Sequence, residues 1–103
     1  MLKPADCHNK PEIRAEIDRI DRALVDLLVE RFGYVRRMAE LKQDPGEAYI
    51  QERVDEVLDR VAAEAEAKGL GADLVRSMWK TLIDWNVDYE SRTIAARKQS
   101  GTK

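Results

Sequence analysis

Two cations near the middle of the chain have the types and spacing of an anion-binding pair. Apolar residues recur at alternating spacings of four and three from position 13 to position 41, and Arg31 takes one place in that series. Burying a guanidinium without a partner is strongly disfavoured, so something anionic should meet it. Lys42 follows 11 residues later. On a continuous helix it projects within about 20° of Arg31, roughly 16 Å along the axis.

An amide and a carboxyl interrupt the apolar stripe of the last segment in a similar way. Asn86 and Glu90 follow Trp79 and Ile83 at spacings of three and four, on the face that should be buried. One interpretation is that Glu90 simply pairs with one of the two cations inside a helical bundle. The other is that cations, amide and carboxyl together line a ligand site. The spacing alone leaves both open.

Arg14 joins these residues only if a second chain contributes it. It stands 17 residues before Arg31, which is about 25 Å along a helix and roughly 100° around it. One small ligand therefore cannot touch both arginines of one chain. In an antiparallel dimer, Arg14 of the partner subunit could lie beside Arg31 and Lys42; the alternative is a solvated residue of the first helical turn. Three convergent cations with a carboxyl and an amide suit a compact dianion that carries another hydrogen-bond acceptor, and arginine binds carboxylates in bidentate fashion.

The elements that position these residues are predicted to be helices. Segment 11–43 carries its apolar residues along one helical seam, and segments 47–68 and 72–98 each carry an apolar stripe at helical spacing. No part alternates with period two for long enough to predict a strand. The fold class is therefore all-α: a single domain, 1–103, with a three-helix protomer and a very long first helix.

Capping residues mark the predicted helix ends. Asn9 and Glu12 indicate the start of the first helix, and the Asp-Pro-Gly run at 44–46 ends it. Gly69 ends the second helix. The tail from Gln99 onward is expected to fray.

The first helix is too long for a compact domain of this size. About 33 residues extend roughly 50 Å, whereas a compact chain of about 100 residues is only about 35 Å across. The apolar seam runs nearly from end to end, so something must cover its protruding part. A second copy related by a two-fold axis does this most economically. The sequence therefore predicts an obligate, intertwined two-fold helical-bundle homodimer.

Composition excludes several classes of partner and site. Of 103 residues, 18 are Lys or Arg and 20 are Asp or Glu, for a net charge of −2. No global positive field attracts nucleic acid or an anionic membrane. Uncharged runs are far too short for a signal peptide or a membrane span. Cys7 is the only cysteine and His8 the only histidine, which fits a reducing cytoplasm and predicts neither a metal site nor a cofactor.

One ordered motif runs through the chain: Ile13-Arg14-x-x-Ile17-Asp18-x-Ile20-Asp21, then Leu27-Leu28-x-x-Arg31, Lys42 and Glu52-Arg53. With the segment 85–90, it resembles the all-helical AroQ class of chorismate mutases over nearly the whole chain. The head Pro4-x-Asp6-Cys7 and the short connection from position 42 to 52 are similar to the branch that contains the isochorismate pyruvate lyases. The resemblance implies a small dicarboxylate substrate, either chorismate or isochorismate.

The resemblance also implies roles for single residues. Arg14 of one subunit and Arg31 of the other bind the two substrate carboxylates, while Lys42 and Glu90 approach the ether oxygen. A carboxylate cannot donate a hydrogen bond, so Glu90 must be protonated to act there, and activity should decline as pH rises.

Two further residues are assigned by the resemblance, and some positions depart from it. Glu52 binds a ring hydroxyl, and Asn86 lines the pocket. Gln51 stands where well-known mutases carry an arginine, and Ala48 falls near the place of an aspartate that assists Glu52 in them. The sequence therefore favours a chorismate mutase, with isochorismate pyruvate lyase as the alternative and a non-catalytic helical dimerisation module as a remote third.

Overall fold

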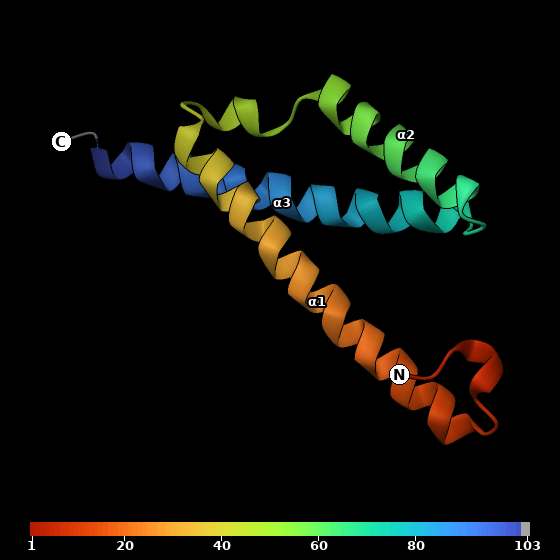
Figure 1. The fold of residues 1–103 in the computed structure, drawn as a ribbon. Coiled ribbons are helices and arrows are strands. Elements are labelled where there is room, and N and C mark those ends of the chain that lie inside the picture. Colours follow the sequence, from red (N-terminus) through yellow and green to blue (C-terminus); the bar gives the residue numbers. More distant parts are fainter. Residues whose placement is uncertain (102–103) are drawn as a thin grey trace. The chain divides into compact units, whose positions relative to one another are not determined.

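The protein is all-helical over the residues that the computed structural model describes, 1–101 (Figure 1). No strand occurs among them. In chain order the elements are two short 3-10 helices and three long α-helices: η1 (Pro4–Asp6), α1 (Lys10–Leu41), η2 (Pro45–Ala48), α2 (Gln51–Ala67) and α3 (Ala72–Gly101). The prediction of three helices with a very long first one is confirmed.

The start of α1 is capped as the sequence predicts. The backbone N–H of Glu12 donates to Asn9 Oδ1 at 2.9 Å. In return, Glu12 Oε1 accepts from the Asn9 side-chain amide at 2.7 Å and from the backbone N–H of His8 at 3.2 Å. These bonds satisfy donors that the first turn of a helix leaves without an intrahelical partner. The helix therefore begins where its local sequence specifies.

The predicted start of the second helix at residue 47 is wrong. Glu47 instead belongs to η2, where its Oε2 accepts from the backbone N–H groups of Gln43, at 2.6 Å, and Asp44, at 2.8 Å. This reciprocal capping closes a single turn on itself, and the chain then runs extended through Ile50, where φ is −125°. Ile50 therefore precedes α2 and is 51% exposed, instead of contributing to its apolar stripe.

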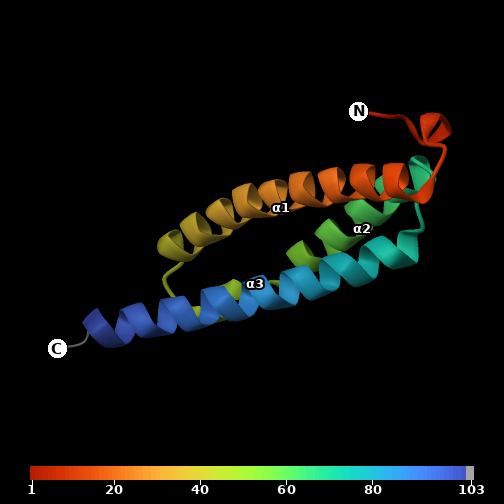
Figure 2. The same cartoon turned by 90° about the horizontal axis from the view of Figure 1, so that it is seen from below.

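The turn between α2 and α3 depends on Gly69. Its φ is +80°, a left-handed conformation that side-chain-bearing residues rarely adopt. This conformation lets Leu70 N donate to Ala65 O at 2.8 Å and Gly69 N donate to Glu66 O at 3.1 Å, a Schellman closure of the helix end. The chain then reverses, and α3 runs back along α2 (Figures 1 and 2).

The chain divides into two compact units, Met1–Tyr34 and Val35–Lys103. In the second unit, the core residues Val54, Val57 and Ile83 pack with three partly buried neighbours, Leu58, Trp79 and Val87. Ile94 further along α3 is fully buried. The expected fraying from Gln99 onward is wrong as far as Gly101, because α3 stays helical to that residue; positions 102 and 103 lie outside the described residues.

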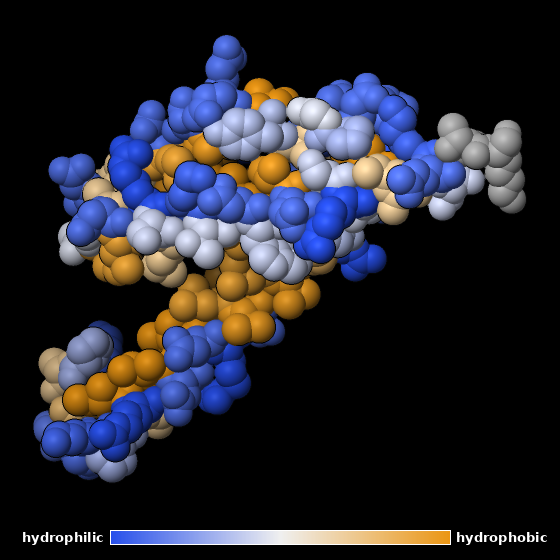
Figure 3. All heavy atoms as spheres, turned by 180° about the vertical axis from the view of Figure 1, so that it is seen from behind, coloured by the Kyte–Doolittle hydropathy of each residue, from blue (hydrophilic) through white to orange (hydrophobic). Residues whose placement is uncertain are grey.

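The first unit keeps its apolar seam at the surface. The seam side chains are each at least 46% exposed: Ile13, Ile17, Ile20, Leu24 and Leu27. Figure 3 shows apolar side chains gathered along α1. No helix within residues 1–101 is both long enough and apolar enough to cross a membrane. That the whole of 1–103 forms a single domain stays a prediction.

Candidate active site

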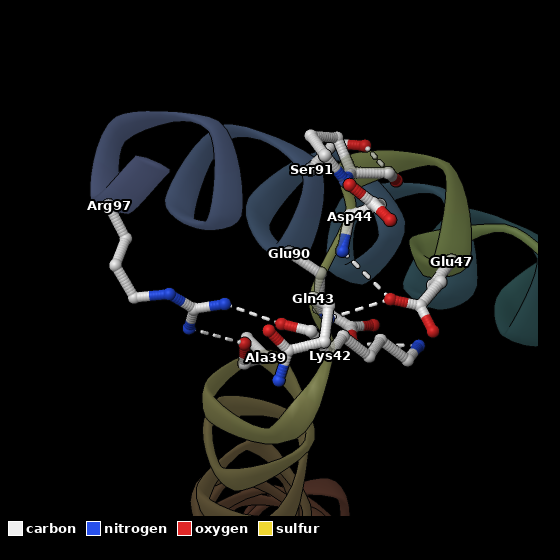
Figure 4. Close-up of polar contacts among 9 residues, drawn as sticks. Ala39, Lys42, Gln43, Asp44, Glu47, Glu90, Ser91 and Arg97 are labelled. Carbon is white, nitrogen blue, oxygen red and sulfur yellow. Dashed lines mark hydrogen bonds and ion pairs between the residues drawn. The ribbon is translucent and has the colours of Figure 1, made fainter. Parts of the chain in front are cut away.

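A sheltered ion pair joins the end of α1 to α3 in the second unit (Figure 4). Lys42 follows the last residue of α1, and its backbone N–H still donates to Met38 O at 3.0 Å. Its side chain reaches Glu90, with 3.0 Å between Lys42 Nζ and Glu90 Oε1. Only 17% of the lysine side chain and 9% of the glutamate side chain are exposed. Lys42 and Glu90, which the resemblance assigns to the ether oxygen of the substrate, are therefore in contact with each other.

Asn86 lies one helical turn before Glu90 on the buried face of α3. It is 6% exposed, and the apolar residues Ile83 and Ile94 on the same helix are buried as well. Residues four apart on a helix share a face. The prediction that an amide and a carboxyl interrupt a buried stripe is confirmed. Asn86 therefore lies on the same face of α3 as Glu90.

The pair of Lys42 and Glu90 agrees with the interpretation that the carboxyl meets a cation inside the bundle. Such a pair is weak evidence of stability, because desolvating two charges offsets their attraction. What the pair can do chemically is clearer. An ammonium has three donors and no acceptor, so Lys42 Nζ can donate to Glu90 and to another oxygen together. In surroundings poor in water, that donor is worth far more than at the surface.

The loop that follows Lys42 is fastened to α3 by side chains that sequence reasoning did not single out. Arg97 Nη1 donates to Ala39 O at 2.8 Å, and Arg97 Nη2 donates to Lys42 O. Ser91 Oγ donates to Pro45 O at 3.2 Å. No local signal marks these residues, since a serine or arginine inside a helix does not reveal which distant carbonyl it will meet.

The remaining predicted site residues occupy other places on the helices. Arg14 is exposed and Arg31 is half-buried, both on α1 within the first unit. Glu52 lies in the first turn of α2 with an exposed side chain. The structure thus brings Lys42 and Glu90 together, and the convergence of the two arginines and Glu52 on a common ligand stays a prediction.

The head of the chain offers little nucleophilic chemistry. Partial burial raises the pKa of the Cys7 thiol, and the carboxylates of Glu12, Glu16 and Asp6 raise it further. A thiol with a raised pKa stays protonated and is a poor nucleophile. Among residues 1–101, no group of three or more His, Cys, Asp or Glu side chains gathers where it could hold a metal ion.

The family of this chain follows from a match that covers most of its length. The family described as chorismate mutase type II matches residues 13–91, a stretch that includes Arg14, Arg31, Lys42, Asn86 and Glu90. The protein belongs to this family. The resemblance stated from the sequence motif is confirmed.

Individual relatives differ in how much of their length the chain matches. The isochorismate pyruvate lyase of Pseudomonas aeruginosa is 34% identical over 87 residues, which are 84% of this chain and 86% of that protein. The T-proteins of Enterobacter agglomerans and Haemophilus influenzae are 35% and 34% identical over 69% and 70% of this chain. In both T-proteins the match takes in only 19% of the relative's own length.

Proposed function

We propose that the protein is a chorismate mutase, which rearranges chorismate to prephenate at a site shared by two subunits. The observation that carries the proposal is the sheltered contact of Lys42 Nζ with Glu90 Oε1 at 3.0 Å, in a chain of the type II family. It provides a desolvated hydrogen-bond donor at the place where the family match implies an ether oxygen. The one-domain organisation of 1–103 and a cytoplasmic location, which suits the lone Cys7, are parts of the proposal.

The rearrangement is intramolecular, so the protein has two tasks and no covalent step. It holds the enolpyruvyl side chain over the ring in the reactive shape, through Arg31 and through Arg14 of the partner subunit, each on one carboxylate. It also stabilises the negative charge that builds on the ether oxygen as the carbon–oxygen bond breaks, through Lys42. Glu52 binds the ring hydroxyl and Asn86 lines the pocket in this proposal. No cofactor or metal enters it.

Glu90 has a role that depends on its proton. As a carboxylate, with its Oε1 3.0 Å from Lys42 Nζ, it cannot donate to the ether oxygen, whereas the neutral acid can donate. A bound dianion disfavours a further negative charge beside it. Glu90→Gln keeps a donor at this position and should therefore retain most of kcat, whereas Glu90→Leu removes the donor and should lower kcat; equal kcat values of the two variants would reject this role.

The alternative within the same site is isochorismate pyruvate lyase. The similarity to the Pseudomonas aeruginosa enzyme over 84% of this chain favours it. That elimination also cleaves the ether bond of a compact, folded substrate, so the same two arginines and Lys42 would serve. A non-catalytic helical dimerisation module is the remote third possibility.

One experiment separates these functions. Purified protein is incubated with chorismate and, separately, with isochorismate, and prephenate, salicylate and pyruvate are measured. Prephenate from chorismate supports the mutase, salicylate with pyruvate from isochorismate supports the lyase, and turnover of neither contradicts both.

Two lysine-to-alanine substitutions test the role of Lys42 as the sheltered donor. Lys42→Ala should lower kcat about 10²–10³-fold, the usual loss when a preorganised donor to a developing charge is removed. Lys80→Ala is the matched control, because Lys80 also pairs with a carboxylate, Asp84 Oδ1 at 2.6 Å, but lies at the surface of α3. Equal activity of both variants would contradict the proposed role of Lys42.

The shared site makes a separate prediction about mixed dimers. Arg14→Ala and Arg31→Ala chains should each be inactive. After subunit exchange, about half of the dimers are mixed and one of their two sites carries both arginines, so about a quarter of the activity should return. Absence of recovery despite demonstrated exchange would contradict a site built from two chains.

A further inference from the structure

We propose that Arg97 is a positioning residue for Lys42, which it holds by the backbone while Glu90 holds the side chain. The inference rests on the proposed function, because it assigns Arg97 a part in presenting the ammonium of Lys42 to the ether oxygen. In this proposal Arg97 acts through Lys42, because its guanidinium donates to backbone carbonyls.

The contacts of Arg97 are with the end of α1. Nη1 donates to Ala39 O at 2.8 Å, and Nη2 donates to the carbonyl of Lys42 itself. The last carbonyls of an α-helix have no partner within the helix. A cation at that end also interacts favourably with the helix dipole. In Figure 4 the guanidinium extends from α3 to the last turn of α1. One planar fork therefore joins the carbonyls of Ala39, Glu40 and Lys42.

Arg97 and Glu90 act from one face of α3. They are seven residues apart, which is about two helical turns, and so they project within roughly 20° of each other. Glu90 Oε1 lies 3.0 Å from Lys42 Nζ, and Arg97 meets the Lys42 carbonyl. Lys42 is thus attached to the same helix face at both of its ends. Without Arg97, only the flexible side chain of Lys42 keeps a contact with α3.

The neighbouring lysine of α3 provides a control that separates this role from general attachment of the loop. Lys98 Nζ lies 2.6 Å from Asp44 Oδ1, with both side chains about half exposed. Like Arg97, it is a cation near the end of α3 that contacts the segment after α1. Its partner Asp44 lies beyond the end of α1 and is not Lys42.

The first measurement is steady-state kinetics on the full-length protein. A misplacement of about 1 Å at a reacting group lowers the rate up to about 100-fold. Arg97→Met keeps the aliphatic stem, and we expect it to lower kcat about 10–100-fold with KM changed less than about twofold, since the carboxylate clamps are untouched. Arg97→Lys should recover part of kcat through a single hydrogen bond. Lys98→Ala should keep kcat within about twofold of the unmodified protein.

A double substitution shows whether Arg97 acts through Lys42. In a Lys42→Ala background, Arg97→Met should lower kcat no further, because the group that it positions is gone. A full additional 10–100-fold loss in that background would overturn the positioning role. So would an Arg97→Met enzyme that behaves like Lys98→Ala, while the proposed function would stand.

A final measurement needs no turnover. Hydrogen exchange of the Lys42 backbone N–H, bonded to Met38 O at 3.0 Å, reports how firmly the end of α1 is held. We expect about tenfold faster exchange in Arg97→Met and no change in Lys98→Ala. Unchanged exchange in Arg97→Met would overturn the inference by itself. A wild-type protein that converts neither substrate would instead overturn the proposed function.

Discussion

The two units of the chain are built from similar helices but differ in what covers their apolar side chains. In the second unit, α2 and α3 bury Val54, Val57 and Ile83 against each other, and Ile94 is fully buried. In the first unit, the seam of α1 has the same regular spacing, yet Leu24 is 48% exposed. A lone helix of this kind is marginal in water, because most helical stability in proteins comes from packing of the apolar face.

This difference shows that an apolar pattern indicates which face of a helix must be covered, but not which segment covers it. For α2, the next helix in the chain supplies the cover. For the seam of α1, we propose that a second copy does. The predictions below test that contrast, from the largest expected effect to the smallest.

A charge placed in the seam of α1 should abolish dimer formation. Leu24→Glu replaces a side chain whose burial is worth about 1.5–3 kcal/mol with a charge, and a two-fold dimer carries the change twice. We expect the dimer dissociation constant to rise at least about 1,000-fold, measured by analytical ultracentrifugation. Val29→Glu is the matched control, because Val29 is 67% exposed and lies on the opposite face of the helix. Equal effects of the two substitutions would contradict the proposed interface.

Truncating one isoleucine in each unit compares how much its burial contributes to stability. Ile94→Ala should lower the free energy of unfolding by about 2–5 kcal/mol, because Ile94 is 0% exposed. Ile17 is 50% exposed within its own chain. If a second copy covers it, Ile17→Ala should cost about 2–3 kcal/mol, and the loss should grow on dilution. Denaturant unfolding at two protein concentrations measures both, and a loss under about 0.5 kcal/mol for Ile17→Ala would count against the dimer.

One glycine in each unit should respond to alanine with opposite sign. Gly69→Ala places a side chain at φ +80°, and the left-handed conformation should lower stability by about 1–2 kcal/mol. Gly33 lies within α1, and an added Cβ there meets no atom within 4 Å. Gly33→Ala should therefore raise stability by up to about 1 kcal/mol. Thermal unfolding measures both changes, and a loss of dimer in Gly33→Ala would show that the partner approaches at this position.

Surface carboxylates should give the smallest effect, and it depends on pH. A hydrogen bond from Arg19 lowers the pKa of Glu16 in the first unit, and one from Lys68 lowers the pKa of Glu64 in the second. A lowered pKa in the folded state adds stability above the unfolded value, and this stability is lost as pH falls through the folded value. Arg19→Ala and Lys68→Ala should raise the respective pKa in NMR titrations. Unmoved titration curves would show that these contacts do not form in solution.

Local sequence determined the elements and most of their ends. The spacing of apolar residues predicted three helices and the long α1, and Asn9 with Glu12 and Gly69 marked ends that the structure confirms. The same spacing identified Asn86 and Glu90 as polar residues on a helix face that the structure buries. These features follow from the 3.6-residue period and from bonds within a few positions along the chain.

Only the tertiary structure decided which of those side chains meet. No local pattern specified the contact of Lys42 with Glu90 or the hydrogen bond of Arg97 to Ala39 O, 58 residues away. Contacts between distant segments depend on the angle and depth at which helices pack. The period of a helix says which side is apolar and leaves open which carbonyl or carboxylate a long side chain will find across the interface.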